Sequence, residues 1–196
     1  MFLQFMQGKL GDRGIYEKQI ERWRADIKPK AIGYLGSTSG VTDDGDLVAV
    51  VRFESTEAAE ANNNIPEQGA WWSEMEKAFD GDVTFIDCDT VDLVGAGGSD
   101  QAGFVQIMLG RAVDPQAMRA AGESMETELK EMRPDVLGGV VGWYGDRQFI
   151  QAMYFTSEAD ARKAETGMAD DPQVDEWNKM LDGDMTFIDI KDPDYD

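Results

Sequence analysis

The chain has 196 residues, 42% of them hydrophobic, and 39 acidic against 18 basic side chains give it a formal net charge of −21. It can therefore bury a core, while its charge repels the phosphates of nucleic acids and of membrane surfaces, so neither is expected as a partner. The absence of histidine removes the commonest general base and the usual ligand of haem. The acidic residues are spread along the chain, which predicts a solvated surface; adaptation to high salt stays open.

The N-terminal segment MFLQFMQGKLGD has no basic region and no long apolar run, and no window approaches the length of a membrane span. We therefore expect a cytoplasmic protein. The single cysteine, Cys88, excludes an intrachain disulfide and is expected to be a small apolar strand residue without an activated thiolate.

The sequence of the first half of the chain predicts a strand, a helix, a hairpin of two strands, a second helical region and a last strand. The apolar run at 2–8 ends in glycine, as expected of a buried strand. A helix is predicted next, because bulky side chains recur at spacings of four, three and four at Tyr16, Ile20, Trp23 and Ile27. Two extended runs joined by an Asp-Gly turn then predict a hairpin. Ser55 can cap a second helical region, which Pro66 interrupts and which ends at the Asp-Gly-Asp turn before a last strand.

The same order of elements returns 102 positions later. DGDMTFIDIK from Asp182 nearly repeats DGDVTFIDCD from Asp80, and Phe104 follows Phe2 by the same interval. This indicates a tandem duplication. Only the middle departs from this register, because KPKAIG and RPDVLG align best three residues out of it. We predict a first repeat at 1–93, a glycine-rich linker at 94–103 and a second repeat at 104–196.

Strand, helix, strand, strand, helix, strand is the order of the ferredoxin-like βαββαβ unit. One such unit leaves a sheet face bare, so two sheets are expected to pack face to face. The doubled order, with a loose pattern that recurs in the second copy, resembles the dimeric α+β barrel superfamily and its antibiotic biosynthesis monooxygenase-like members; the pattern comprises Phe53, Ser55, Ala59, Pro66 and Trp72, matched by Phe155, Ser157, Ala161, Pro172 and Trp177. The resemblance implies an α+β fold in which two tandem ferredoxin-like repeats form a barrel as a fused pseudo-dimer. Without histidine, the haem-degrading and chlorite-dismutating branches are excluded.

The segment NNNIPEQGAWW at 62–72 differs almost wholly from its counterpart in the second copy, which suggests that one half carries a specialised site. Amides and a carboxylate beside two indoles suit a flat ligand, so Asn63, Glu67 and Trp71 are candidate binding residues. Alternatively, the asparagines merely end a helix. Trp72 shares a helical stripe with core positions, whereas Trp71 lies on the flank of that stripe and is the better candidate for a pocket edge or a partner contact.

Two further pairs occupy equivalent places in the copies. Gln4 and Gln106 interrupt apolar strands, and the resemblance implies that this strand contributes a polar residue to the barrel cavity; alternatively, the two amides join the sheets. Arg52 and Tyr154 form the second pair. Arg52 shares a strand face with valines, so its guanidinium is expected to be partly buried beside an acid, Glu54 or Glu67, or an anionic ligand.

The acidic turns, Asp80/Asp82, Asp182/Asp184 and Asp43–Asp46, lack the ligand spacing of a calcium loop, so no metal is expected, and no cofactor is implied. Three functions stay open. The chain binds a small apolar or aromatic molecule in the barrel cavity, or it is a cofactor-independent monooxygenase-like enzyme in which Asn63, Arg52, Tyr154 and Trp71 hold a substrate anion. The third is a non-catalytic scaffold, as a monomer or a homo-oligomer with Trp71 in the contact.

Overall fold

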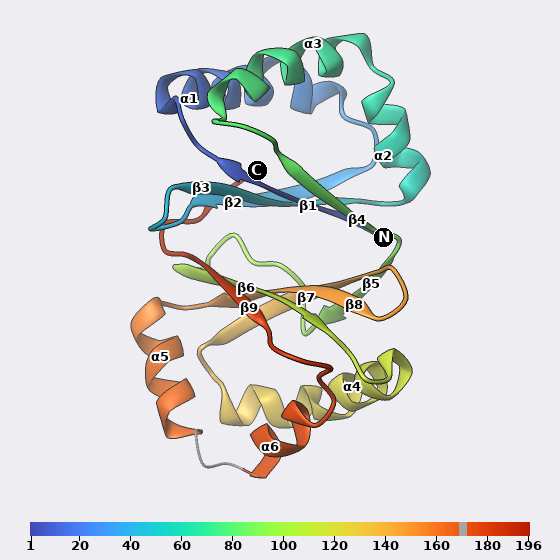
Figure 1. Ribbon diagram of the computed structural model, residues 1–196, viewed down its shortest axis with the longest axis vertical. Coiled ribbons are helices and arrows are strands. Elements are labelled where there is room, and N and C mark those ends of the chain that lie inside the picture. Colours follow the sequence, from blue (N-terminus) through green and yellow to red (C-terminus); the bar gives the residue numbers. More distant parts are fainter. Residues whose placement is uncertain (169–171) are drawn as a thin grey trace. The chain divides into compact units, whose positions relative to one another are not determined.

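The computed structural model describes residues 1–168 and 172–196, apart from the side chains at 126–128, 130 and 173. The chain forms two compact units, the first made of Met1–Asp89 with Asp194–Asp196 and the second of Thr90–Pro193. Each unit is a five-stranded antiparallel sheet with its helices on one face (Figure 1). The prediction of an α+β fold with two tandem ferredoxin-like repeats is confirmed.

The first sheet has the strand order β10-β2-β3-β1-β4. Its strands are β1 (Phe2–Lys9), β2 (Tyr34–Val41), β3 (Asp46–Phe53), β4 (Thr84–Cys88) and β10 (Asp194–Tyr195). Its helices are α1 (Arg13–Arg22), a π-helical turn (Trp23–Ile27), α2 (Thr56–Asn63) and α3 (Pro66–Met75), with short 3-10 turns at Lys28–Lys30 and Glu76–Ala78.

The second sheet has the matching order β5-β7-β8-β6-β9. Its strands are β5 (Thr90–Val94), β6 (Phe104–Arg111), β7 (Val136–Tyr144), β8 (Gln148–Phe155) and β9 (Thr186–Ile190). Its helices are α4 (Pro115–Met132), α5 (Glu158–Gly167) and α6 (Pro172–Asn178). None of the helices in the described part of the chain is long and apolar enough to cross a membrane.

The edge strands reveal an exchange that the repeat pattern does not predict. Strand β5 lies at the C-terminal end of the predicted first repeat, yet it pairs with β7 in the second sheet, Thr90 opposite Trp143. Strand β10 lies at the C-terminal end of the predicted second repeat, yet it pairs with β2 in the first sheet, Asp194 opposite Ser39. Each unit therefore contains one strand from the far end of the other repeat.

The predicted three-residue shift in the middle of the repeat is wrong. Gly36 pairs with Arg52 on β3, and Gly138 pairs with Tyr154 on β8, so both hairpins keep the interval of 102. The two glycines occupy the bulge at the start of their strands with φ of 135° and 157°, a conformation that favours glycine. The prediction was wrong because the alignment of KPKAIG with RPDVLG paired Gly138 with Gly33, which lies before the bulge, instead of with Gly36.

The local signals in the helices are confirmed. Ser55 and Ser157 cap α2 and α5 by accepting hydrogen bonds from Ala58 N at 3.2 Å and Asp160 N at 3.1 Å. Pro66 occupies the first turn of α3, where its missing N–H costs nothing. The helical stripe of the first unit is buried at Tyr16, Trp23 and Ile27, which pack against Leu47 of β3.

Candidate functional site

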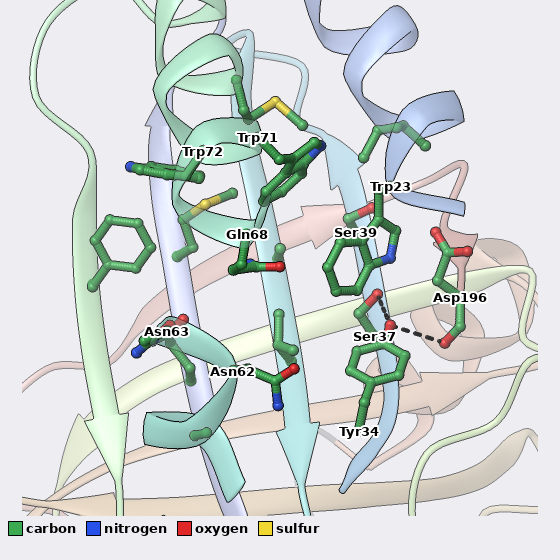
Figure 2. A pocket seen from close by; sticks show the side chains of 18 of the residues that line it. Trp23, Tyr34, Ser37, Ser39, Asn62, Asn63, Gln68, Trp71, Trp72 and Asp196 are labelled. Carbon is green, nitrogen blue, oxygen red and sulfur yellow. Dashed lines mark hydrogen bonds between the residues drawn. The ribbon is translucent and has the colours of Figure 1, made fainter. Parts of the chain in front are cut away.

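A cavity of about 400 Å³ lies within the first unit, between the sheet and its helices (Figure 2). Side chains of β1 and β3 form its floor at Met6, Leu47, Ala49 and Val51, because alternate residues of a strand point to the same face. Aromatic side chains form most of its walls, namely Tyr16, Trp23, Tyr34, Trp71, Trp72 and Phe85. The volume falls in the range of small-molecule sites.

The indoles form a connected aromatic wall. The rings of Trp23 and Trp71 lie 5.3 Å apart at 45°, those of Trp71 and Trp72 6.0 Å apart at 54°, and those of Trp72 and Phe85 5.2 Å apart at 69°. Such tilted arrangements are favourable for aromatic pairs. These four rings line the cavity from three elements, Trp71 and Trp72 from α3, Trp23 from the π-helical turn and Phe85 from β4.

Trp71 lines this wall and is also buried, with 9% of its surface exposed. Its Nε1 donates a hydrogen bond of 2.8 Å to the Gln19 carbonyl of α1. Helix α1 packs against α3, so the flank of α3 faces another helix. Trp72, expected in the core, is half-buried, because its side of α3 lies toward the edge strand β4. The sequence pattern therefore assigned the relative burial of the two tryptophans the wrong way round.

The carboxamide of Asn62 holds the pocket wall in place where α2 meets the loop before β2. Its Nδ2 donates to Ile32 O at 2.6 Å and to Ala58 O at 2.9 Å, while its Oδ1 accepts from Ile32 N at 3.1 Å. These bonds tie α2 to the loop before β2. Asn62 therefore supports the wall, while the neighbouring Asn63 is exposed at the rim.

Replacing Asn62 with alanine is expected to lower the free energy of unfolding by about 1–2 kcal/mol, because both backbone groups of Ile32 lose their partner. Urea unfolding followed by circular dichroism measures the change. The matched control is Asn63→Ala, which should alter stability by less than about 0.5 kcal/mol. Equal costs for the two variants would contradict the assignment of the supporting role to Asn62.

Gln68 lines the pocket from α3 (Figure 2), and its Oε1 is buried without a hydrogen-bond partner among the described residues. A buried carbonyl oxygen without a partner is costly, so this atom has acceptor capacity that a ligand can use. Gln4, on β1, also lines the pocket, but its Nε2 already donates to Asp87 Oδ1 at 2.8 Å.

The wall beside β2 is closed by a tyrosine and residues 194–196. Tyr34 Oη lies 2.8 Å from Ser37 Oγ and 3.2 Å from the Asp196 carbonyl oxygen. Burial raises the pKa of Tyr34 to about 12, so the phenol is protonated at neutral pH. Burial also raises the pKa of Tyr16, against a hydrogen bond from Ser39 that lowers it.

The charge on this wall is neutralised locally. Arg24 Nε lies 2.9 Å from Asp196 Oδ1, and Lys28 Nζ lies 3.4 Å from the same oxygen. Arg24 also pairs with Asp194 at 2.7 Å, and the hydrogen bond with Asp196 raises the pKa of the guanidinium. Among the described lining residues, Asp196 is the only aspartate, glutamate, lysine or arginine.

Three of the residues predicted from the sequence come together at this pocket, namely Gln4, Asn63 and Trp71. Arg52 does not, because Val51 and Phe53 on either side of it face the pocket, and strand alternation turns Arg52 to the opposite face of β3. The Arg52 Nε is buried there without a hydrogen-bond partner among the described residues.

The expected ion pair between Arg52 and Glu67 is not formed. Glu67 is exposed outside the pocket and pairs instead with Lys30 at 3.4 Å. Sequence reasoning missed Trp23, which reads as an ordinary core position of the first helix. It also missed Tyr34 and Gln68, although Gln68 lies inside the divergent segment that was singled out.

In the second unit the counterpart of Gln4, Gln106, belongs to a charged network. Gln106 is buried, and its Nε2 donates to Asp189 Oδ1 at 3.1 Å. Arg162 also pairs with Asp189 and lies over the ring of Phe104 at 5.1 Å. Tyr154, the counterpart of Arg52, is fully buried. A second-unit cavity beside β7 measures about 150 Å³, too small for a comparable ligand.

Cys88 lies at the end of β4 and is fully buried. Burial, with the carboxylates of Asp87 and Asp89, raises the pKa of the thiol from its ordinary 9.0 to about 12. Among the described residues, no group of three or more acidic or cysteine side chains is placed to hold a metal ion.

The native protein is therefore expected to leave a disulfide reagent such as DTNB unreacted at about pH 8, and unfolding in urea should release one thiol per chain. Because the folded pKa exceeds the unfolded one, the thiol's contribution to stability is present below about pH 9 and is lost as the pH rises toward 12. Rapid modification of the folded protein would show that Cys88 is accessible.

No protein-family model and no curated protein matches the sequence. Solved structures do match the fold over the whole chain. A candidate monooxygenase from Fusobacterium nucleatum is 9% identical with a TM-score of 0.73, covering 96% of this chain and 90% of its own. A candidate monooxygenase from Lactobacillus acidophilus is 13% identical with a TM-score of 0.70, covering 99% and 98%.

An uncharacterised ferredoxin-fold protein from Listeria monocytogenes, related to antibiotic biosynthesis monooxygenases, is 8% identical with a TM-score of 0.52, covering 97% of this chain and 94% of its own. The chain therefore has the ferredoxin-like fold of antibiotic biosynthesis monooxygenase-like proteins, with two such halves in tandem. At these identities the similarity establishes the fold alone.

Proposed function

We propose that the protein binds a flat aromatic molecule in the pocket of its first unit. The observation that carries the proposal is the connected wall of Trp23, Trp71 and Trp72 around a cavity of about 400 Å³. Ring stacking and apolar burial favour an aromatic ligand, and few polar groups are present to orient it. The ligand is thereby assigned to a pocket between sheet and helices, instead of the barrel cavity expected from the resemblance.

The alternative of a monooxygenase-like enzyme has less support. That hypothesis placed a substrate anion beside Arg52 and Tyr154, and neither lines this pocket. The candidate monooxygenases among the similar structures share the fold at 9% and 13% identity. A shared fold at such identities does not assign the chemistry of their sites to this chain. We therefore propose ligand binding as the function. Consumption of oxygen by the protein in the presence of an aromatic hydroquinone would instead favour the enzyme.

The test uses N-phenyl-1-naphthylamine, a neutral probe that fluoresces when it enters an apolar site. Titration into the purified chain should give saturable fluorescence with one probe per chain, because the cavity beside β7 in the second unit measures only about 150 Å³. Energy transfer from tryptophan to the bound probe should accompany binding, since three indoles line the site. Absence of saturable binding would refute the proposal. Native mass spectrometry of protein isolated from its own host would then show whether a natural ligand already occupies the pocket.

A further inference from the structure

We propose that the pocket selects neutral aromatic molecules that carry a hydrogen-bond donor, such as protonated phenols, and rejects their anions. This inference rests on the proposed function and specifies the class of ligand. It follows from the charges, the free hydrogen-bonding atoms and the behaviour of the two tyrosines in the same wall.

The charges on the pocket wall disfavour an anion. No lysine or arginine is among the described lining residues, and the two cations that contact the lining residue Asp196, Arg24 and Lys28, are paired with its carboxylate. Arg52 lies on the other face of the sheet. An anion would lose its hydration without gaining a cationic partner, in a chain whose net charge of −21 adds a repulsive field.

The hydrogen-bonding groups favour a donor on the ligand. Asn62 is already committed to the backbone, since both hydrogens of its Nδ2 and its Oδ1 are bonded to backbone groups. Gln68 Oε1 is the buried pocket atom that still lacks a partner among the described residues. A ligand hydroxyl can donate to it, whereas a phenolate or a methyl ether cannot.

The pocket already contains two phenols that report on its interior. Burial raises the pKa of both Tyr16 and Tyr34. A ligand phenol in the same space meets the same low polarity, so its neutral form should be favoured in the same direction. Its affinity should consequently decline as the pH rises above the pKa of the free ligand.

Three naphthalenes of similar size separate these effects, namely 2-naphthol, 2-methoxynaphthalene and 2-naphthoate. Isothermal titration calorimetry at neutral pH should show 2-naphthol binding about tenfold more tightly than the ether, the value of one hydrogen bond, and the carboxylate binding more weakly still. Bound 2-naphthol should also ionise at higher pH than free 2-naphthol, as followed by its absorbance spectrum.

The variant Gln68→Leu should abolish the preference for 2-naphthol over the ether while retaining the binding of both. Glu67→Gln, one residue away and outside the pocket, is the matched control and should keep the preference. Equal affinity of the wild type for naphthol and ether, or tighter binding of the carboxylate, would overturn the inference and leave the proposed function standing. Failure of all three compounds to bind would overturn the proposed function itself.

Discussion

Replacing Trp71 with alanine is expected to lower the free energy of unfolding by about 3–5 kcal/mol, the usual cost of removing a large aromatic side chain from a core. Its ring packs against Trp23 and Met75 in the first unit, and its Nε1 satisfies the Gln19 carbonyl. Removing the ring leaves a cavity and a carbonyl without its partner. Urea unfolding monitored by far-ultraviolet circular dichroism measures the loss.

Trp72→Ala provides the matched control for this effect. Trp72 follows directly in the same helix and has the same size, but it is only half-buried, so its removal should cost about 1–2 kcal/mol. An equal or larger cost at Trp72 would show that the burial described for the two indoles is reversed.

The second large effect concerns the ligand. Ala49→Phe is expected to weaken probe binding at least about a hundredfold, because the new ring would project from the floor of β3 into the cavity of about 400 Å³. The space that the ring fills is already open, so the melting temperature should change by only a few degrees. Fluorescence titration and thermal unfolding of the same preparation give both results.

Gln151→Phe serves as the control, since Gln151 occupies the equivalent position on β8 of the second unit. It introduces the same side chain at a place that the proposed function does not use, so binding should be unchanged. If Ala49→Phe binds the probe as well as Gln151→Phe, the pocket of the first unit is not the site.

Much of the fold could be predicted because its signals are local or repeated. The interval of 102 is visible in repeated segments, and the cap at Ser55 and the interruption of the helical region at Pro66 are visible in neighbouring residues. The exchange of β5 and β10 could not, since β10 comprises only Asp194 and Tyr195 and pairs far along the chain. The register of β2 was predicted wrongly because the bulge at Gly36 is determined by the pairing of β2 with β3 and not by residue identities shared between the two copies.

The site was predicted in part for similar reasons. Divergence between the copies drew attention to Asn63 and Trp71, and polarity within an apolar strand drew attention to Gln4. Alternation grouped Arg52 with the valines of its own face, but which face meets the helices is decided by tertiary packing. Tyr34 was missed because it reads as an ordinary strand residue until Ser37 and Asp196 are brought beside it.

The pairing of β10 with β2 also constrains when the first unit can form during synthesis. Asp194 and Tyr195 lie opposite Ser39 and Thr38, so the edge of this sheet must wait for residues made long after the rest of it. Contacts so distant along the chain close slowly. Until they close, β2 is an exposed edge open to pairing with other chains. The pocket wall at Asp196 cannot form before residues 194–196 have emerged from the ribosome, and a nascent chain should acquire its full ligand affinity only after that point.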